Sequence, residues 1–149
     1  MKILALDTAL NACSVAIMDA DDICAHLHEK RRRGHAETLM PMVQSLMKKA
    51  ELCYHDLDLI AVTVGPGTFT GLRIGLATAR GIALAADKPI VGITSLEALA
   101  ASVPREIAAG RPIVATADAR RSAFSDFLLY VIICCFLRVL GVFSRLSNL

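Results

Sequence analysis

The residues whose types and spacing could do chemistry surround a glycine turn, Gly65-Pro66-Gly67. The segment 60–64 before this turn is uncharged and rich in β-branched residues, as in a strand that is buried on both faces. A helix is expected to begin at 68–71, with Thr68 or Thr70 as its cap. Because the free N–H groups of a helix N-terminus attract negative charge, this turn could bind a phosphate or another anion.

Neither common phosphate motif is complete at this turn. A P-loop has Lys after its last glycine, but Leu72 and Arg73 follow Gly71, and a dinucleotide-binding turn has a third glycine where Thr70 stands. Because these motif residues are missing, the sequence favours a second interpretation, in which the helix packs tightly on its sheet or on another helix. One ridge of the helix is nearly bare, because small residues recur at every fourth position: Gly71, Gly75, Ala79 and Ala83.

Metal chemistry has weaker support in the sequence. His26 and His28 share one face of an expected strand, but no third ligand is in view. His35 and Glu37 resemble half of a metalloprotease helix motif, but Leu39 occupies the position of the second His. We therefore expect no metal site and no metalloprotease chemistry.

The composition is that of one cytoplasmic domain. The 149 residues suffice for a core, and the net charge of +2 is too small to imply nucleic-acid binding by itself. The basic run 31–33 could touch RNA phosphates, although such a run is more often simply solvated. The N-terminal apolar segment is too short for a signal peptide. Five cysteines without metal-like spacing are expected to be reduced, buried thiols: Cys13, Cys24, Cys53, Cys134 and Cys135.

The expected elements form an α/β fold with helices on a mixed sheet. Three strands come first, at 3–6, 13–18 and 23–30, and a hairpin turn at 19–22 joins the last two. In the third strand we expect Ile23 on the same face as Ala25 and Leu27. Helices are expected at 36–50, from 68–71 to 86, and after Thr94 or Ser95. Further strands are expected at 60–64, 89–93 and 112–117, and a connector at 103–111.

The helix expected at 36–50 has an apolar stripe that is widened by methionines. The stripe consists of Leu39, Val43, Leu46 and Ala50, and Met40 and Met47 broaden it. Methionine side chains make a pliable apolar surface. The sequence leaves open whether this surface faces another protein or is plain core.

Five segments together carry a resemblance to a known family. The chain resembles the bacterial TsaB family, also called YeaZ, from Met1 to about Arg120 with the motifs in the same order. The motifs are 3–9 (ILALDTA), 13–16 (CSVA), 35–41 (HAETLMP), 65–75 (GPGTFTGLRIG) and 118–120 (DAR).

The resemblance implies an actin/hexokinase-like fold, with a mixed five-stranded sheet and flanking helices. In catalytic members of this class the first hairpin loop holds nucleotide phosphate and its metal. Asp7 and Thr8 occupy that place here, together with Gly65 and Gly67 of the turn, although the loop lacks the usual glycine. We therefore expect a degenerate nucleotide site and no cofactor of the chain's own, with ATP or ADP bound only at the interface with a partner subunit.

The resemblance also implies a non-catalytic partner role. Family members support a TsaD-type subunit that, with a TsaE-type ATPase, transfers a threonylcarbamoyl group onto a tRNA adenosine, so tRNA is contacted only through the complex. Dimerisation, as a homodimer or with TsaD, is implied through the first two helices, with no membrane contact. The expected interface residues are Leu39, Met40, Val43, Met47, Gly71, Leu72, Gly75 and Ala79.

Two other function classes stay open. An ATP-dependent enzyme of the same superfamily would depend on Asp7 and the Gly65 turn. A protease is suggested only by the older label glycoprotease, and no set of nucleophile, base and orienting residue supports it.

The expected domain organisation departs from the family at the C-terminus. We expect an N-terminal domain at 1–103, a connector and first strand of an incomplete second domain at 104–120, and an atypical apolar tail at 121–149. The tail shows neither strand alternation nor helical amphipathy, and its uncharged run is short for a membrane helix. We interpret it as out-of-frame translation that begins near Arg121; a buried element and a membrane anchor are the alternatives.

Overall fold

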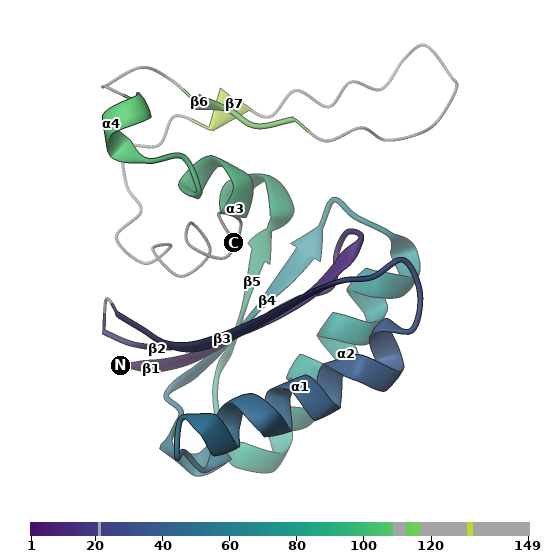
Figure 1. Cartoon of the computed structure of the whole chain (residues 1–149), viewed down its shortest axis with the longest axis vertical. Coiled ribbons are helices and arrows are strands. Elements are labelled where there is room, and N and C mark those ends of the chain that lie inside the picture. The colour runs from purple at the N-terminus through teal and green to yellow at the C-terminus, as the bar shows by residue number, and fades with distance from the viewer. Residues whose placement is uncertain (21, 109–112, 117–130, 133–149) are drawn as a thin grey trace.

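A five-stranded mixed sheet forms the centre of the molecule (Figure 1). The computed structural model describes residues 1–20, 22–108, 113–116 and 131–132. The strand order is β3-β2-β1-β4-β5. β2 runs antiparallel to both of its neighbours, β1 and β3, whereas β4 and β5 run parallel to β1. The strands are β1 (Lys2–Asp7), β2 (Ala12–Asp19), β3 (Asp22–Lys30), β4 (Leu59–Gly65) and β5 (Ile90–Thr94). The predicted mixed sheet is confirmed.

Helices cover both faces of this sheet. The helices α1 (His35–Lys49) and α2 (Phe69–Ala86) lie on one face, and α3 (Ser95–Ala101) lies on the other (Figure 1). Both long helices begin on the side of the sheet where β1 ends. The reason is that α1 follows β3 and α2 follows β4, and both of these strands run in the same direction as β1. The shorter elements are η1 (Tyr54–Asp56), α4 (Arg105–Ala108), β6 (Ile113–Val114) and β7 (Val131–Ile132).

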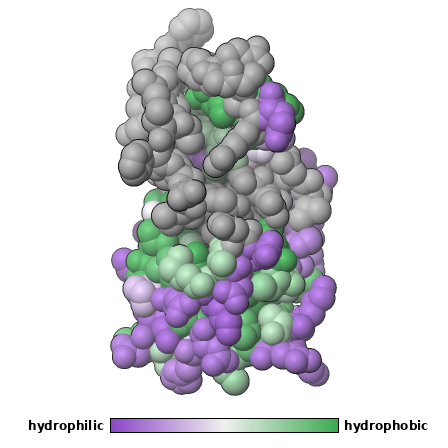
Figure 2. Space-filling view, turned by 90° about the vertical axis from the view of Figure 1, so that its left-hand side faces the viewer, coloured by the Kyte–Doolittle hydropathy of each residue, from purple (hydrophilic) through white to green (hydrophobic). Residues whose placement is uncertain are grey.

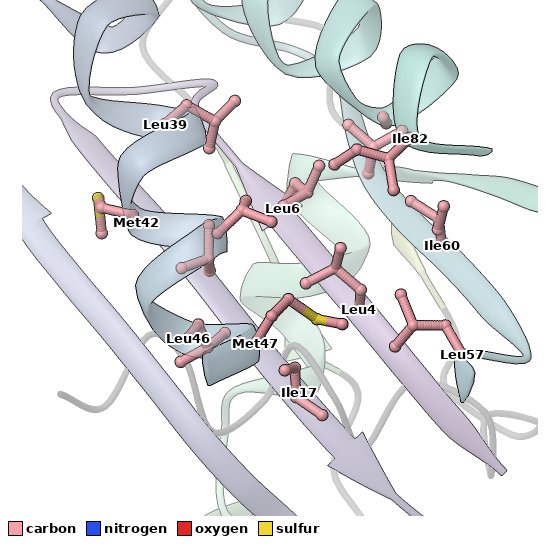
Figure 3. Packing of buried hydrophobic residues seen from close by; sticks show 14 of the residues in the cluster. Leu4, Leu6, Ile17, Leu39, Met42, Leu46, Met47, Leu57, Ile60 and Ile82 are labelled. Atoms are coloured by element: carbon pink, nitrogen blue, oxygen red, sulfur yellow. The ribbon is translucent and has the colours of Figure 1, made fainter. Parts of the chain in front are cut away.

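The main core lies between the sheet and the two long helices. Figure 3 shows Met42 and Met47 of α1 in one cluster with Leu4 of β1 and Ile17 of β2. The apolar stripe of α1 therefore packs on the chain's own sheet. Burial of apolar side chains on this scale is the main stabilising term of the fold.

Local signals predicted where the helices begin. The Thr68 side chain accepts a hydrogen bond from the Gly71 N–H at 3.2 Å and caps α2. Thr94 and Glu97 form a reciprocal capping box at the start of α3. Pro41 is the seventh residue of α1, past the first turn in which proline is readily tolerated.

A β-bulge changes the predicted face of one strand. The register between β2 and β3 shifts at Ile17 and Met18, so that Ala25 pairs with Ile17 but Ile23 pairs with Met18. The prediction that Ile23 shares a face with Ala25 was therefore wrong, because one extra residue reverses the alternation of side chains.

The cysteines differ in burial. Cys13 is buried and free, and burial raises the pKa of its thiol to about 11. Cys24 and Cys53 are exposed, so the prediction of buried thiols was wrong for these two. Cys134 and Cys135 lie outside the described residues.

The C-terminal part is only partly described. The predicted connector contains the short helix α4, and two residues of the predicted sixth strand form β6, which pairs with β7. Ile113 and Ala115 pack with Leu96 and Ala100 of α3. The rest of the tail at 121–149 lies outside the described residues, and the domain boundaries stay a prediction.

Candidate functional site

The glycine turn and the first hairpin loop are joined at the carboxyl end of β1. The Thr68 N–H donates to the Ala9 carbonyl oxygen at 2.7 Å, across the turn. A Cβ atom added at Gly67 would lie 2.5 Å from that same oxygen, which is closer than a real side chain can approach. The peptide bond between Gly65 and Pro66 is cis, and Gly65 has φ +116°, a conformation that other residues rarely adopt. The turn is therefore built to lie against the hairpin loop.

The glycines of α2 make room for Thr8. The Thr8 side chain is 1% exposed, and its hydroxyl donates to the Gly71 carbonyl oxygen at 2.7 Å. A Cβ atom at Gly75 would lie 2.5 Å from the Thr8 Oγ1, and one at Gly71 would overlap the Thr8 carbonyl oxygen. Tight packing of the helix on its sheet, the favoured interpretation of the sequence, is thus confirmed.

Asp7 holds the end of β1 in place. Its Oδ1 accepts hydrogen bonds from the Thr63 hydroxyl at 2.8 Å and from the Ala9 N–H at 2.9 Å. The other carboxylate oxygen, Oδ2, has no hydrogen-bond partner among the described residues. The carboxylate therefore links β1, β4 and the hairpin loop.

These contacts are a poor fit to a nucleotide phosphate. The N–H groups of Ala9, Thr68 and Gly71 donate to oxygens of the chain itself. Thr8 was predicted as a binding residue, but its hydroxyl is buried and already donates to Gly71. A phosphate cradle needs free N–H groups that converge on one point. The N–H groups of Ala9, Thr68 and Gly71 are therefore not free to bind a phosphate in this conformation.

Six of the eight residues predicted at the partner interface are buried within the chain, and the interface itself stays a prediction. The side chains of Leu39, Val43 and Met47 are buried in the main core, and Met40 and Leu72 are only partly buried. Three further predicted residues are buried on α2, namely Gly71, Gly75 and Ala79. Periodicity identified the packing faces of both helices correctly, but these faces pack on the chain's own sheet.

The opposite side of α2 is exposed. Phe69 is 69% exposed and Leu84 is 86% exposed, and the guanidinium of Arg73 lies 3.9 Å from the centre of the Phe69 ring. A Cβ atom at Gly81 would meet nothing within 4 Å. We define the outer face of α2 by its exposed residues Phe69, Arg73, Ala77, Arg80, Gly81 and Leu84.

The sequence also contains a signal for this outer face. A second repeat of four residues runs through Phe69, Arg73, Ala77, Gly81 and Ala85, beside the buried ridge. Both ridges are rich in small residues, so spacing alone cannot say which one faces the sheet. The structure shows that the ridge with Gly71 and Gly75 faces the sheet, because both glycines lie against Thr8.

The structure brings together a serine and a histidine that the sequence did not pair. The Ser14 Oγ and the His28 Nδ1 form a hydrogen bond of 2.8 Å across β2 and β3. Ser14 is only 4% exposed, and no carboxylate bonds to His28 among the described residues. A nucleophile needs both access and an oriented base, so this pair gives the protease alternative no support.

The described part of the chain contains neither a cluster of metal ligands nor a membrane-spanning helix. No three His, Cys, Asp or Glu side chains there could hold a metal ion, and His26 and His28 gain no third ligand. None of the described helices is long and apolar enough to cross a membrane. The side of the molecule shown in Figure 2 is mainly hydrophilic in its lower half, with smaller hydrophobic areas between.

Comparison with known proteins identifies relatives for most of the chain. Residues 23–132 match the family model described as TsaD: tRNA N6-adenosine threonylcarbamoyltransferase. The tRNA threonylcarbamoyladenosine biosynthesis protein TsaB of Escherichia coli strain K12 is 40% identical over 120 residues, which cover 80% of this chain and 51% of that protein. The protein of the same name from Haemophilus influenzae is 36% identical over 80% of this chain and 50% of its own length.

A solved structure shows the same fold. YeaZ from Pseudomonas aeruginosa is 38% identical and superposes with a TM-score of 0.72, over 80% of this chain and 55% of that chain. The chain thus spans about half the length of the relatives that it matches.

Proposed function

Because the chain belongs to the TsaD family of tRNA N6-adenosine threonylcarbamoyltransferases and is similar to its TsaB (YeaZ) members, we propose that it is a non-catalytic partner subunit in this modification of tRNA. It would support a TsaD-type catalytic subunit in the cytoplasm, together with a TsaE-type ATPase. The chain would contact tRNA only through the complex.

One observation carries the non-catalytic part of this proposal. The N–H groups of Ala9, Thr68 and Gly71 all donate within the chain, at the place where catalytic relatives of the fold class would hold phosphate. Opening these bonds to admit an anion would take hydrogen bonds away from the Asp7 carboxylate, the Ala9 carbonyl oxygen and the Thr68 hydroxyl, which costs free energy. We therefore propose that the chain binds no nucleotide of its own, and that any ATP or ADP in the complex is bound with the help of the partner.

The outer face of α2 supports the partner role. Leu84 is 86% exposed on a regular helix. Covering such a large apolar side chain with a second surface removes it from water and lowers the free energy. The residues Ala77 and Gly81 would let a partner helix approach closely. We propose this face as the contact with the TsaD-type subunit, in place of the buried residues predicted from the sequence.

Co-purification of the full chain with the TsaD-type subunit of the same genome tests the proposal. We expect the wild type to bind, and Leu84→Glu to lose binding because a carboxylate would be forced into an apolar contact. Ile107→Glu is the matched control, because it places the same charge on an exposed apolar residue of α4 and should leave binding unchanged.

Two results would contradict the proposal. The partner role fails if the wild type does not bind the TsaD-type subunit. The assignment of the outer face fails if Leu84→Glu binds as tightly as Ile107→Glu.

A further inference from the structure

The connection between β3 and α1 contains the only run of four consecutive basic residues in the chain. Lys30 ends β3, and Arg31, Arg32 and Arg33 follow it directly. Lys30, Arg32 and Arg33 are exposed, whereas Arg31 is half-buried. The run lies on the side of the molecule where α1 and α2 both begin (Figure 1). The sequence leaves open whether this run contacts RNA or is only solvated, and the structure shows which of its charges are free for a contact.

One of the four cations is paired within the chain. The Arg31 guanidinium forms an ion pair with the Glu29 carboxylate at 3.1 Å. A Cβ atom added at Gly34 would lie 3.1 Å from the Arg31 Nη1 and 3.9 Å from the Glu37 Oε2, so Arg31 and Glu37 both lie close to Gly34. The other three basic residues form no ion pair within the described part of the chain. Three exposed cations are therefore available to a partner.

The backbone of this connection is held at both ends. The Arg31 N–H donates to the Asn11 carbonyl oxygen at 2.9 Å, which joins the connection to the first hairpin loop. The Thr38 hydroxyl donates to the Gly34 carbonyl oxygen at 3.0 Å, and Gly34 has φ +80°. Because the backbone between these two bonds is already restrained, little backbone freedom is lost when its side chains bind an anion.

The composition of segment 30–34 indicates the chemistry of its partner. The segment contains no apolar and no aromatic side chain. It can therefore neither bury apolar surface, as the core of a protein interface does, nor stack on a nucleic-acid base. Its arginine and lysine side chains can bind phosphate oxygens through charge-assisted hydrogen bonds. The segment thus fits a phosphate backbone that is contacted without regard to base sequence.

Starting from the proposed partner role, we propose that this segment contacts the phosphate backbone of the tRNA once the complex has formed. Three free cations are too few to hold RNA by themselves, since the affinity of such contacts depends on the number of phosphates that are neutralised. On a subunit that is already bound beside the tRNA, the same contacts become intramolecular and add to the affinity of the whole complex. The chain then helps to hold the tRNA without contributing a catalytic residue.

The double substitution Arg32→Gln with Arg33→Gln tests this inference in the complex of the full chain with the TsaD-type subunit. The probe is an unmodified tRNA transcript, titrated at several salt concentrations. We expect the variant complex to bind it at least about tenfold more weakly at about 0.1 M salt. The slope of log K against log salt should shrink by about 1.4–1.8, because two phosphate contacts are lost. Arg32→Lys with Arg33→Lys keeps both charges and should retain most of the affinity.

Lys2→Gln with Lys88→Gln is the matched control. Lys2 begins β1, and Lys88 lies between α2 and β5, so this variant loses the same charge at the opposite end of the sheet. Its tRNA affinity should equal that of the wild type. Co-purification with the TsaD-type subunit should be the same for all variants, and circular dichroism checks that each one is folded.

Several results would overturn the inference. One is an unchanged tRNA affinity and salt slope in the double substitution. Another is an equal loss in the control, because net charge and not this segment would then be responsible. A third is loss of binding to the TsaD-type subunit, which would place the segment in a protein contact. Vesicles that contain phosphatidylglycerol test lipid phosphate, and vesicle binding that needs both arginines while tRNA affinity is unchanged would assign the segment to a lipid surface.

The outcomes separate this inference from the function on which it depends. If the wild type binds the TsaD-type subunit and the double substitution leaves tRNA binding unchanged, the partner role stands and the phosphate contact fails. If the wild type does not bind the TsaD-type subunit at all, the proposed function and this inference both fail.

Discussion

At the end of β1, one carboxylate oxygen links three parts of the chain. The Oδ1 of Asp7 accepts from Thr63 on β4 and from Ala9 in the hairpin loop, while Thr8 next to it is buried against α2. In this arrangement the polar residues at the end of the strand stabilise the packing of the loop. The same residue types at the same position could serve a ligand only if the surrounding N–H groups were free.

We expect Asp7→Ala to lower the free energy of unfolding by about 1–3 kcal/mol, because the Thr63 hydroxyl and the Ala9 N–H lose their acceptor. Asp7→Asn keeps an acceptor oxygen and should cost less. Urea unfolding of the full chain measures both.

Titration with ATP should show no binding by the wild type. Tight binding that disappears in Asp7→Ala would instead favour an ATP-dependent enzyme.

At the scale of a single element, α2 has two ridges of small residues, one buried against the sheet and the other exposed. The ridge with Gly71 and Gly75 closes on Thr8 and on Val62 of β4, whereas the ridge with Ala77 and Gly81 is exposed. A helix of this composition can pack closely on both sides. The helix α2 can therefore pack on the sheet with one side and contact a partner with the other.

Adding one methyl group to each ridge should have opposite effects. Gly75→Ala is expected to lower the free energy of unfolding by about 1–3 kcal/mol, because the new Cβ atom would lie 2.5 Å from the Thr8 Oγ1. Gly81→Ala should raise it by about 0.5–1 kcal/mol, since the site is open and alanine is the better helix former. Thermal unfolding of both variants checks the pair. Equal effects would show that the two ridges do not differ in packing.

At the scale of the whole molecule, the sheet and its helices form a core within a chain that spans about half the length of its relatives. Cys13 lies inside this core on β2, where burial raises the pKa of its thiol to about 11 from 9.0. Burial also raises the pKa of Tyr54. Both groups stay neutral in the folded state over a wider range of pH than in the unfolded chain.

Stability should therefore fall at alkaline pH. The contribution of Cys13 is fully present below its unfolded pKa of 9.0 and is lost as the pH rises through about 11, because the unfolded chain then releases the thiol proton more readily. Cys13→Ala should remove part of this slope and leave the part due to Tyr54. Chemical unfolding at a series of pH values between 9.0 and about 11 measures how the free energy of unfolding depends on pH. An unchanged slope in Cys13→Ala would contradict the burial of the thiol.

Most of the elements and the family could be predicted without coordinates. Strand and helix periods, the Thr68 cap and the Thr94 capping box are local in the chain, and the structure confirms each of them. The resemblance to the TsaB (YeaZ) family, confirmed by comparison, depended on contiguous motifs such as 65–75. The face of Ile23 could not be predicted, because a bulge depends on the partner strand.

The sequence by itself determined that α1 and α2 each have a face made for close packing. Only the tertiary structure decided that these faces meet the chain's own sheet, that Thr8 occupies the space left by Gly75, and that Phe69 and Leu84 stay exposed. The physical reason is that periodicity records how side chains are distributed around a helix axis, whereas the rotation of the helix about that axis is set by contacts between residues far apart in the chain.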